Sequence, residues 1–124
     1  MKFYKKSNSF RESYIDTLGK LYDYSTIRYA KNRISKVIDT DKEYTYASFK
    51  AQCDSLSKKL TQFGIGASDK VAILSQNMPE WTVAFFATVP FGRIAIPILP
   101  ESSANEVTNI LNHSESKALF VSKK

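Results

Sequence analysis

Histidine and cysteine, which commonly do acid–base or nucleophilic chemistry, occur once each in this 124-residue sequence, as His113 and Cys53. A general base or a metal ligand needs a second group to orient it, and the neighbours Ser114 and Glu115 form no recognisable arrangement for that role. Cys53 falls on an apolar helix stripe, whereas reactive cysteines lie in exposed electropositive surroundings. We therefore interpret His113 as a residue near a helix end and Cys53 as a buried structural thiol.

Ser75, Gln76 and Asn77 follow the apolar run of Val71–Leu74 and precede Pro79. Open α/β sheets bind ligands beyond the carboxyl ends of their strands, so these polar residues are candidates for ligand contact. Asn77 could equally cap a helix that begins at Pro79, and we favour this second interpretation because asparagine is a strong N-cap residue.

Trp81 and the pair Phe85-Phe86 have the spacing of a buried helix face, although they could also line an acyl pocket. No carboxylate pair has a spacing typical of acid–base catalysis, and no cluster of metal-ligating residues occurs. The four glycines form neither G-x-x-x-x-G-K nor G-x-G-x-x-G, the loops that cradle phosphates. We therefore assign no catalytic, cofactor-binding or metal-binding residue to this chain.

The composition is that of a globular protein, with 43% hydrophobic residues and only four glycines and four prolines. No apolar run approaches the ~18 residues that a membrane span needs. The first residues, MKFYKKSNSFRES, contain no apolar signal core, and a single cysteine fits a reducing compartment. These features predict a cytoplasmic location.

The net charge of +6 is concentrated in residues 1–50, which also contain six of the acidic residues and all seven tyrosines. A basic, tyrosine-rich segment could attract nucleic acid or an anionic membrane. The simpler interpretation, which we favour, is a solvated helix surface whose tyrosine rings pack inward. We expect no nucleic-acid partner, while peripheral membrane contact is compatible with the charge.

Residues 1–33 are predicted to form a helical lead-in, with one helix capped by Ser9 and a second over Thr26–Lys31. Residues 34–46 contain two β-prone runs around Thr40–Lys42, which predicts a hairpin. A helix should follow from Tyr46, with Thr45 as N-cap and Gly64 as the left-handed residue that ends it. Its apolar stripe is Phe49, Cys53, Leu56, Leu60 and Phe63.

Residues 47–124 alternate between helical and strand patterns. After the strand that begins at Lys70, we predict a helix from Pro79 that ends near Pro90 and Gly92. A short or irregular strand containing Pro97 should follow, then a helix capped by Ser103 and Glu106, and a last strand, ALFVS. The fold class is α/β: a partial three-layer domain with a parallel sheet, preceded by N-terminal helices and a hairpin. Because no helix covers the last strand, we expect residues 1–124 to be a segment of a larger domain.

Three motifs make the sequence resemble the N-terminal region of the adenylate-forming (AMP-binding) superfamily, particularly acyl-CoA synthetases of the long-chain fatty acid type. The family patterns L-T-Y-x-E-L, G-D-x-V-A-I-x-x-x-N-x-P-E-W and K-A-G-A-x-x-V-P-L-x-P have the same order and spacing here. The matching positions are Tyr44–Phe49, Asp69–Ile73 with Asn77 and Pro79–Trp81, and Gly92 with Ala95, Pro97 and Pro100. The resemblance covers roughly residues 9–121.

The sequence departs from these patterns at three places: Ser68 replaces a glycine, Pro90-Phe91 replaces K-A, and Arg93 stands where a small residue is usual. These positions belong to the scaffold. The family's phosphate loop, adenine pocket, ribose-binding acid and C-terminal lysine have no counterpart here.

The resemblance implies an enzyme that uses ATP to convert a carboxylate into an acyl-adenylate and then forms a thioester with CoA. It implies ATP, Mg²⁺ and CoA as cofactors of the whole enzyme and none for this segment, which should be inactive alone. The implied partners are the C-terminal remainder of the same chain and a fatty acid substrate. We also expect self-association through exposed apolar faces. The alternative function is a basic, non-enzymatic α/β module that binds nucleic acid or an anionic membrane.

Overall fold

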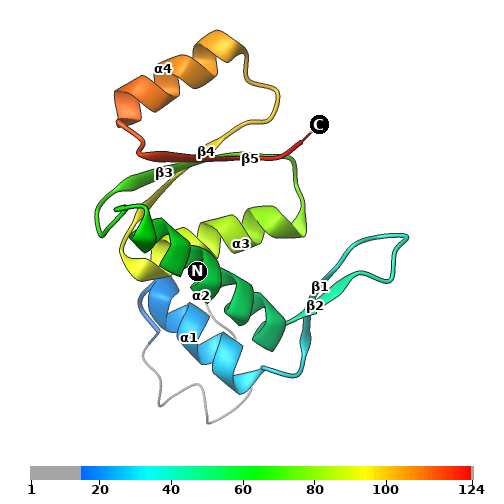
Figure 1. Cartoon of the computed structure of the whole chain (residues 1–124). Helices are drawn as coiled ribbons and strands as arrows, with labels where there is room; N and C mark the ends of the chain where they lie inside the picture. The colour runs from blue at the N-terminus through cyan, green and yellow to red at the C-terminus, as the bar shows by residue number, and fades with distance from the viewer. Residues whose placement is uncertain (1–14, 124) are drawn as a thin grey trace.

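The computed structural model describes residues 15–123, which form a helical layer, a hairpin and a parallel sheet (Figure 1). No helix in this part of the chain is long and apolar enough to cross a bilayer. In chain order the elements are α1 (Leu18–Arg28), β1 (Arg33–Lys36), β2 (Glu43–Thr45), α2 (Tyr46–Gln62), β3 (Lys70–Leu74), α3 (Pro79–Thr88), the 3-10 turn η2 (Val89–Phe91), β4 (Ile94–Ile98), α4 (Ala104–Ser114) and β5 (Ala118–Val121).

The sheet has the order β4-β3-β5, and both pairings are parallel. Its central strand is β3, in which Val71, Ala72 and Ile73 are fully buried. The helices α2 and α3 lie on one face of the sheet and α4 lies on the other (Figure 1). An unbroken apolar run suits a strand that is covered on both faces. The predicted α/β class, with its three layers and parallel sheet, is therefore confirmed.

The prediction for the first helix was partly wrong. Residues 15–28 contain one helix, α1, whose N-cap is Thr17: its side chain accepts a hydrogen bond from the Lys20 amide at 3.1 Å. This single helix continues through Thr26, where the sequence predicts the start of a second helix. Gly19 lies in the first turn of α1 and does not interrupt it. The predicted cap Ser9 lies outside the described residues. The hairpin of β1 and β2 was predicted correctly, and its strands pair antiparallel.

The second helix, α2, begins and ends where the sequence predicts. Thr45 and Ser48 form a reciprocal capping box at its start, and Gly64 adopts a φ of 78° after its end. Phe49, Cys53 and Leu60 are buried as the stripe predicts, but Phe63 is 81% exposed. Phe63 is the C-cap residue, so it has left the helical path that would have continued the stripe.

The core on the α2 face joins three helices. Tyr22 of α1 stacks on Phe86 of α3 with ring centroids 6.0 Å apart, and Phe49 meets Phe86 edge-on at 5.7 Å. The Tyr22 hydroxyl donates to the Asp54 carboxylate at 2.8 Å. Burial of an aromatic ring whose polar group is hydrogen-bonded is the arrangement expected of tyrosine in a core. The tyrosine-rich lead-in therefore contributes at least this one ring to the packing.

The strand β4 is more regular than predicted. It has five residues in continuous register with β3, and Pro97 pairs with Ile73 inside that register. Proline is tolerated here because β4 is an edge strand, so its missing N–H need not bond to a neighbour. The following helix α4 has the predicted capping box, in which the Glu106 carboxylate accepts from the Ser103 amide at 2.7 Å.

Ser68 has a left-handed backbone conformation, with a φ of 67°. Its amide donates to the Gly92 carbonyl at 2.8 Å, and Gly92 is itself left-handed at a φ of 81°. The next residue, Asp69, accepts from the Gly66 amide and pairs with Lys117 at 2.7 Å. The turn before β3 is thus fixed by the backbone conformation of Ser68 and by the carboxylate of Asp69. This explains why a glycine-aspartate pair suits the two positions.

We predict that Ser68→Gly stabilises the chain by about 1 kcal/mol, because glycine avoids the clash that a Cβ makes in the left-handed region. The urea midpoint should rise with an unchanged m-value. Ser68→Ala is the matched control: it removes the hydroxyl but keeps the Cβ, so no gain is expected. An equal gain in both variants would contradict this explanation.

Arg93 is buried, with 5% of its surface exposed. Its guanidinium donates to the Thr61 hydroxyl at 2.7 Å, to the Ser57 hydroxyl at 2.8 Å and to the Ile65 carbonyl at 2.9 Å. Further bonds reach the carbonyls of Ser57 and Ala87. Desolvation lowers the pKa of the Arg93 guanidinium, but an arginine remains charged at neutral pH. One side chain therefore ties α2, α3 and the loop after α2 to the start of β4.

We predict that Arg93→Met destabilises the chain by about 2–4 kcal/mol, because it leaves buried acceptors without a donor. Arg33→Met is the control: Arg33 makes an exposed ion pair with Glu43 at 3.2 Å, and its loss should cost about 0–1 kcal/mol. Urea unfolding of both variants measures the difference. Equal losses would show that the bonds of Arg93 contribute no more than a surface pair.

Candidate functional site: an apolar cavity at the strand ends

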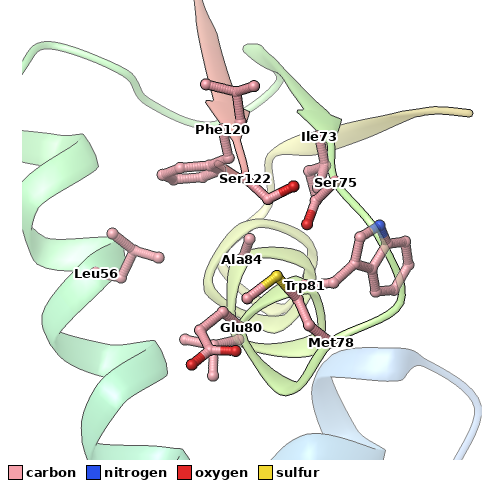
Figure 2. Close-up of a pocket in the computed structure, with 11 residues that line it drawn as sticks. Leu56, Ile73, Ser75, Met78, Glu80, Trp81, Ala84, Phe120 and Ser122 are labelled. Atoms are coloured by element: carbon pink, nitrogen blue, oxygen red, sulfur yellow. The ribbon is translucent and has the colours of Figure 1, made fainter. Parts of the chain in front are cut away.

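A cavity of about 390 Å³ opens at the carboxyl ends of β3 and β5, between α2 and the beginning of α3. Figure 2 shows Leu56 and Phe120 on one side of it, Trp81 on another, and Met78 between them. Its size is within the range of small-molecule pockets, roughly 300–1,000 Å³. The lining residues are Leu56, Ile73, Ser75, Met78, Glu80, Trp81, Val83, Ala84, Phe120, Val121 and Ser122.

The turn between β3 and α3 forms the polar edge of this cavity. The Ser122 hydroxyl accepts from the Gln76 amide at 3.4 Å, and the Ser122 amide donates to the Leu74 carbonyl at 3.2 Å. These bonds hold the ends of β3 and β5 together. The hydroxyls of Ser75 and Ser122 lie on the same side of the cavity (Figure 2). Two hydroxyls and one carboxylate thus border a mostly apolar surface.

The prediction that Asn77 caps α3 was wrong. The N-cap residue is Met78, whose side chain makes no capping hydrogen bond within residues 15–123, and Pro79 occupies the first helical position. Proline fixes where the helix begins, so Asn77 lies one residue too early to cap it. Ser75 lines the cavity, whereas Gln76 and Asn77 are exposed.

The carboxylate of Glu80 connects the cavity to the hairpin. It accepts from the Lys42 ammonium at 2.6 Å and from the Tyr44 hydroxyl at 3.2 Å. The hydrogen bond from Lys42 holds the pKa of Glu80 below its ordinary value, and the same contact raises the pKa of Lys42. Glu80 also lies in the first turn of α3, where a negative charge is favourable. The bonds from Lys42 and Tyr44 therefore hold the hairpin against α3, the helix that borders the cavity.

We predict that the pair of Lys42 and Glu80 stabilises the hairpin only within a defined pH window. The lowered pKa of Glu80 gives stability above about pH 4.5 that is lost as the pH falls through the lowered value. The raised pKa of Lys42 gives stability below about pH 10.5 that is lost as the pH rises through the raised value. Lys42→Met should speed amide exchange in the hairpin by about two- to five-fold at pH 7.

Lys58→Met removes the same charge from an exposed lysine of α2 and should leave hairpin exchange unchanged. A difference between Lys42→Met and the unmodified chain that persists at a pH low enough to protonate Glu80 would rule out the ion pair as its cause.

The remaining candidates are not part of this cavity. Cys53 is fully buried, its thiol contacts the Val83 carbonyl at 3.7 Å, and burial raises the pKa of the Cys53 thiol to about 12. The interpretation as a structural thiol is confirmed. His113 is exposed in the last turn of α4, on the other face of the sheet. Residues 15–123 contain no group of three side chains suited to a metal.

The aromatic candidates behave differently from one another. Trp81 lines the cavity, and its ring stacks on Phe85 at 5.4 Å between centroids. Phe86 packs in the core on the α2 face, and neither Phe85 nor Phe86 is among the lining residues. Sequence reasoning missed Met78, Phe120 and Ser122 as lining residues. The available signal was that Met78 and Ser122 follow two predicted strands and that Phe120 lies near the end of the second strand.

The cavity can hold an apolar group but offers no acid–base pair. Its hydroxyls belong to Ser75 and Ser122, and the only titratable side chain that lines it, Glu80, is held ionised by Lys42. A serine nucleophile needs an adjacent general base. The absence of catalytic, cofactor-binding and metal-binding residues from the chain stays a prediction.

Comparison with known proteins assigns the sequence to a family. The family model described as AMP-binding enzyme matches residues 27–124. The chain is similar to a putative acyl-CoA synthetase, YngI, of Bacillus subtilis, with 31% identity over 85% of this chain and 19% of that protein. It is also 36% identical to the long-chain-fatty-acid–CoA ligase FadD13 of Mycobacterium tuberculosis, over 65% of this chain and 16% of the ligase.

Solved structures show the same fold. The N-terminal domain of FACL13 from Mycobacterium tuberculosis matches with a TM-score of 0.80 and 28% identity, over 86% of this chain and 27% of that domain. The N-terminal subdomain of Klebsiella oxytoca NpsA, in complex with 3-hydroxyanthranilyl-AMSN, matches with a TM-score of 0.77 and 20% identity. It covers 88% of this chain and 28% of the subdomain.

The chain belongs to the AMP-binding enzyme family. It spans about a fifth of the length of the curated relatives that it matches. The resemblance inferred from the three motifs is confirmed.

Proposed function

We propose that this chain is the N-terminal structural segment of an ATP-dependent, AMP-forming acyl-CoA synthetase. The observation that carries the proposal is the match of residues 27–124 to the family, at about a fifth of the relatives' length. The whole enzyme would activate a carboxylate as the acyl-adenylate and transfer it to CoA, with ATP, Mg²⁺ and CoA as cofactors. A fatty acid is the proposed substrate, supported by the printed name of FadD13.

Within that enzyme, residues 1–124 would contribute scaffold. The sequence has no phosphate-cradling loop, and the cavity at the strand ends has no acid–base pair. The segment alone should therefore bind no cofactor and form no adenylate. We further propose a cytoplasmic enzyme with peripheral membrane contact, for which the single cysteine and the basic N-terminal half are the support.

The alternative, a basic module that binds nucleic acid, has no support in the comparisons. The structure also weakens its electrostatic argument, because several basic side chains are paired with carboxylates. These pairs are Lys20–Asp16, Arg33–Glu43, Lys42–Glu80, Lys50–Asp54 and Lys117–Asp69.

We predict that the 124-residue chain releases no pyrophosphate when supplied with ATP, Mg²⁺ and a long-chain fatty acid, because it lacks a phosphate loop. The protein encoded by the whole reading frame should release pyrophosphate only when the fatty acid is present, and should form the thioester when CoA is added. Reactions without fatty acid are the control for ATP hydrolysis. Turnover by the 124-residue chain, or none by the longer protein with any carboxylate, would contradict the proposal.

A further inference from the structure

The two serines that line the cavity at the strand ends, Ser75 and Ser122, have unused hydrogen-bonding capacity. Ser75 donates its hydroxyl proton to the Gln76 carbonyl at 3.1 Å, so the lone pairs of its oxygen are available as acceptors. The Ser122 oxygen accepts from the Gln76 amide at 3.4 Å, and its own proton has no acceptor within residues 15–123. One available acceptor and one available donor therefore lie on the same side of the cavity (Figure 2).

The remaining wall of the cavity is apolar and comes from three elements. Leu56 belongs to α2, Ala84 to α3 and Phe120 to β5. A cavity of about 150 Å³ is large enough for a benzene ring. The volume here is about 390 Å³, so a single ring with a short substituent fits with space to spare. The shape and the lining therefore suit a small apolar molecule that carries one polar group beside the two serines.

The charge of the lining restricts what that polar group can be. Glu80 is the only charged residue among those that line the cavity, and no lysine, arginine or histidine is among them. An ionised carboxylate in an apolar cavity needs a cationic partner, so the cavity does not suit a carboxylic acid. The Glu80 carboxylate already accepts from the Lys42 ammonium at 2.6 Å and from the Tyr44 hydroxyl at 3.2 Å. Glu80 and Lys42 thus form a neutral pair, and an uncharged polar group is favoured over an ammonium.

A hydroxyl group matches the two serines, because it donates one hydrogen bond and accepts another. A ketone or an ether only accepts, so it would leave the Ser75 oxygen without a donor. We propose that this cavity binds a neutral alcohol with a compact apolar body, whose hydroxyl donates to the Ser75 oxygen and accepts from the Ser122 hydroxyl. The site lies wholly within residues 56–122. It therefore does not depend on the proposed function, and it differs in chemistry from the site of a carboxylate substrate.

Benzyl alcohol is a suitable probe for this site. It is titrated into the isotopically labelled 124-residue chain, and the amide chemical shifts are followed by NMR. We expect saturable shifts at the amides of Gln76 and Ser122. Benzoate has the same ring with a carboxylate and should bind at least about ten-fold more weakly, because the cavity offers its charge no partner. Toluene has the ring without a polar group and measures the contribution of the apolar wall alone.

Serine variants separate the hydrogen bonds from the apolar contact. Ser122→Ala should weaken the binding of benzyl alcohol by about two- to ten-fold, because one hydrogen bond is lost, and should leave toluene binding unchanged. Ser75→Ala should have the same selective effect and gives a second, independent test. Ser55→Ala is the matched control: it removes the hydroxyl of an exposed serine of α2 that does not line this cavity, and both ligands should bind as before.

Three results would overturn the proposal. The first is the absence of saturable shifts with benzyl alcohol up to its limit of solubility. The second is an equal effect of Ser122→Ala and Ser75→Ala on benzyl alcohol and toluene, since the serines would then make no hydrogen bond to the ligand. The third is a set of shifts centred on the Gly64 amide, which would place the ligand in the separate cavity between the end of α2 and β5.

Discussion

Burial of β3 on both faces is the constraint on which the rest of this structure depends. A strand with Val71, Ala72 and Ile73 fully buried needs a helical layer above it and another below it. Each neighbouring strand is parallel and is reached by a crossover, with α3 on one face and α4 on the other. The cavity at the strand ends follows from the same arrangement, because the carboxyl ends of β3 and β5 meet at one edge.

The motifs that resemble the family patterns have a common physical role in positioning that strand. Asp69 holds the turn before β3 by accepting from the Gly66 amide, and its ion pair with Lys117 joins it to the segment before β5. Pro79 fixes the start of α3, and Glu80 fastens the hairpin to it through Lys42. The motif that resembles the family pattern therefore supplies the contacts that hold one buried strand in place. For this reason it identifies the family although it contains no reactive group.

Local signals in the sequence were sufficient for most elements. The α2 stripe, its Thr45 cap and the α4 capping box are interactions within three or four residues, so spacing predicts them well. The wrong predictions concern positions where the local sequence pattern alone does not decide the structure. Asn77 was displaced as a cap by the backbone preference of Pro79, and Pro97 was accommodated because β4 lies at an edge. The cavity could not be predicted, since Leu56, Met78 and Phe120 come from three elements that only the fold brings together.

The buried guanidinium of Arg93 has a consequence for how this protein differs from its relatives. Ser57 and Thr61 serve as acceptors only because a long cationic side chain reaches them from the start of β4. A relative with a small residue at this place would have an unfilled space beside α2, and the buried Ser57 hydroxyl would lose the donor that Arg93 supplies. The three positions should therefore change together during divergence, with bulkier apolar side chains replacing the hydroxyls wherever the arginine is absent. Members of the family that share the same residues at these three positions would then form one branch, defined by how the space between α2 and the start of β4 is filled.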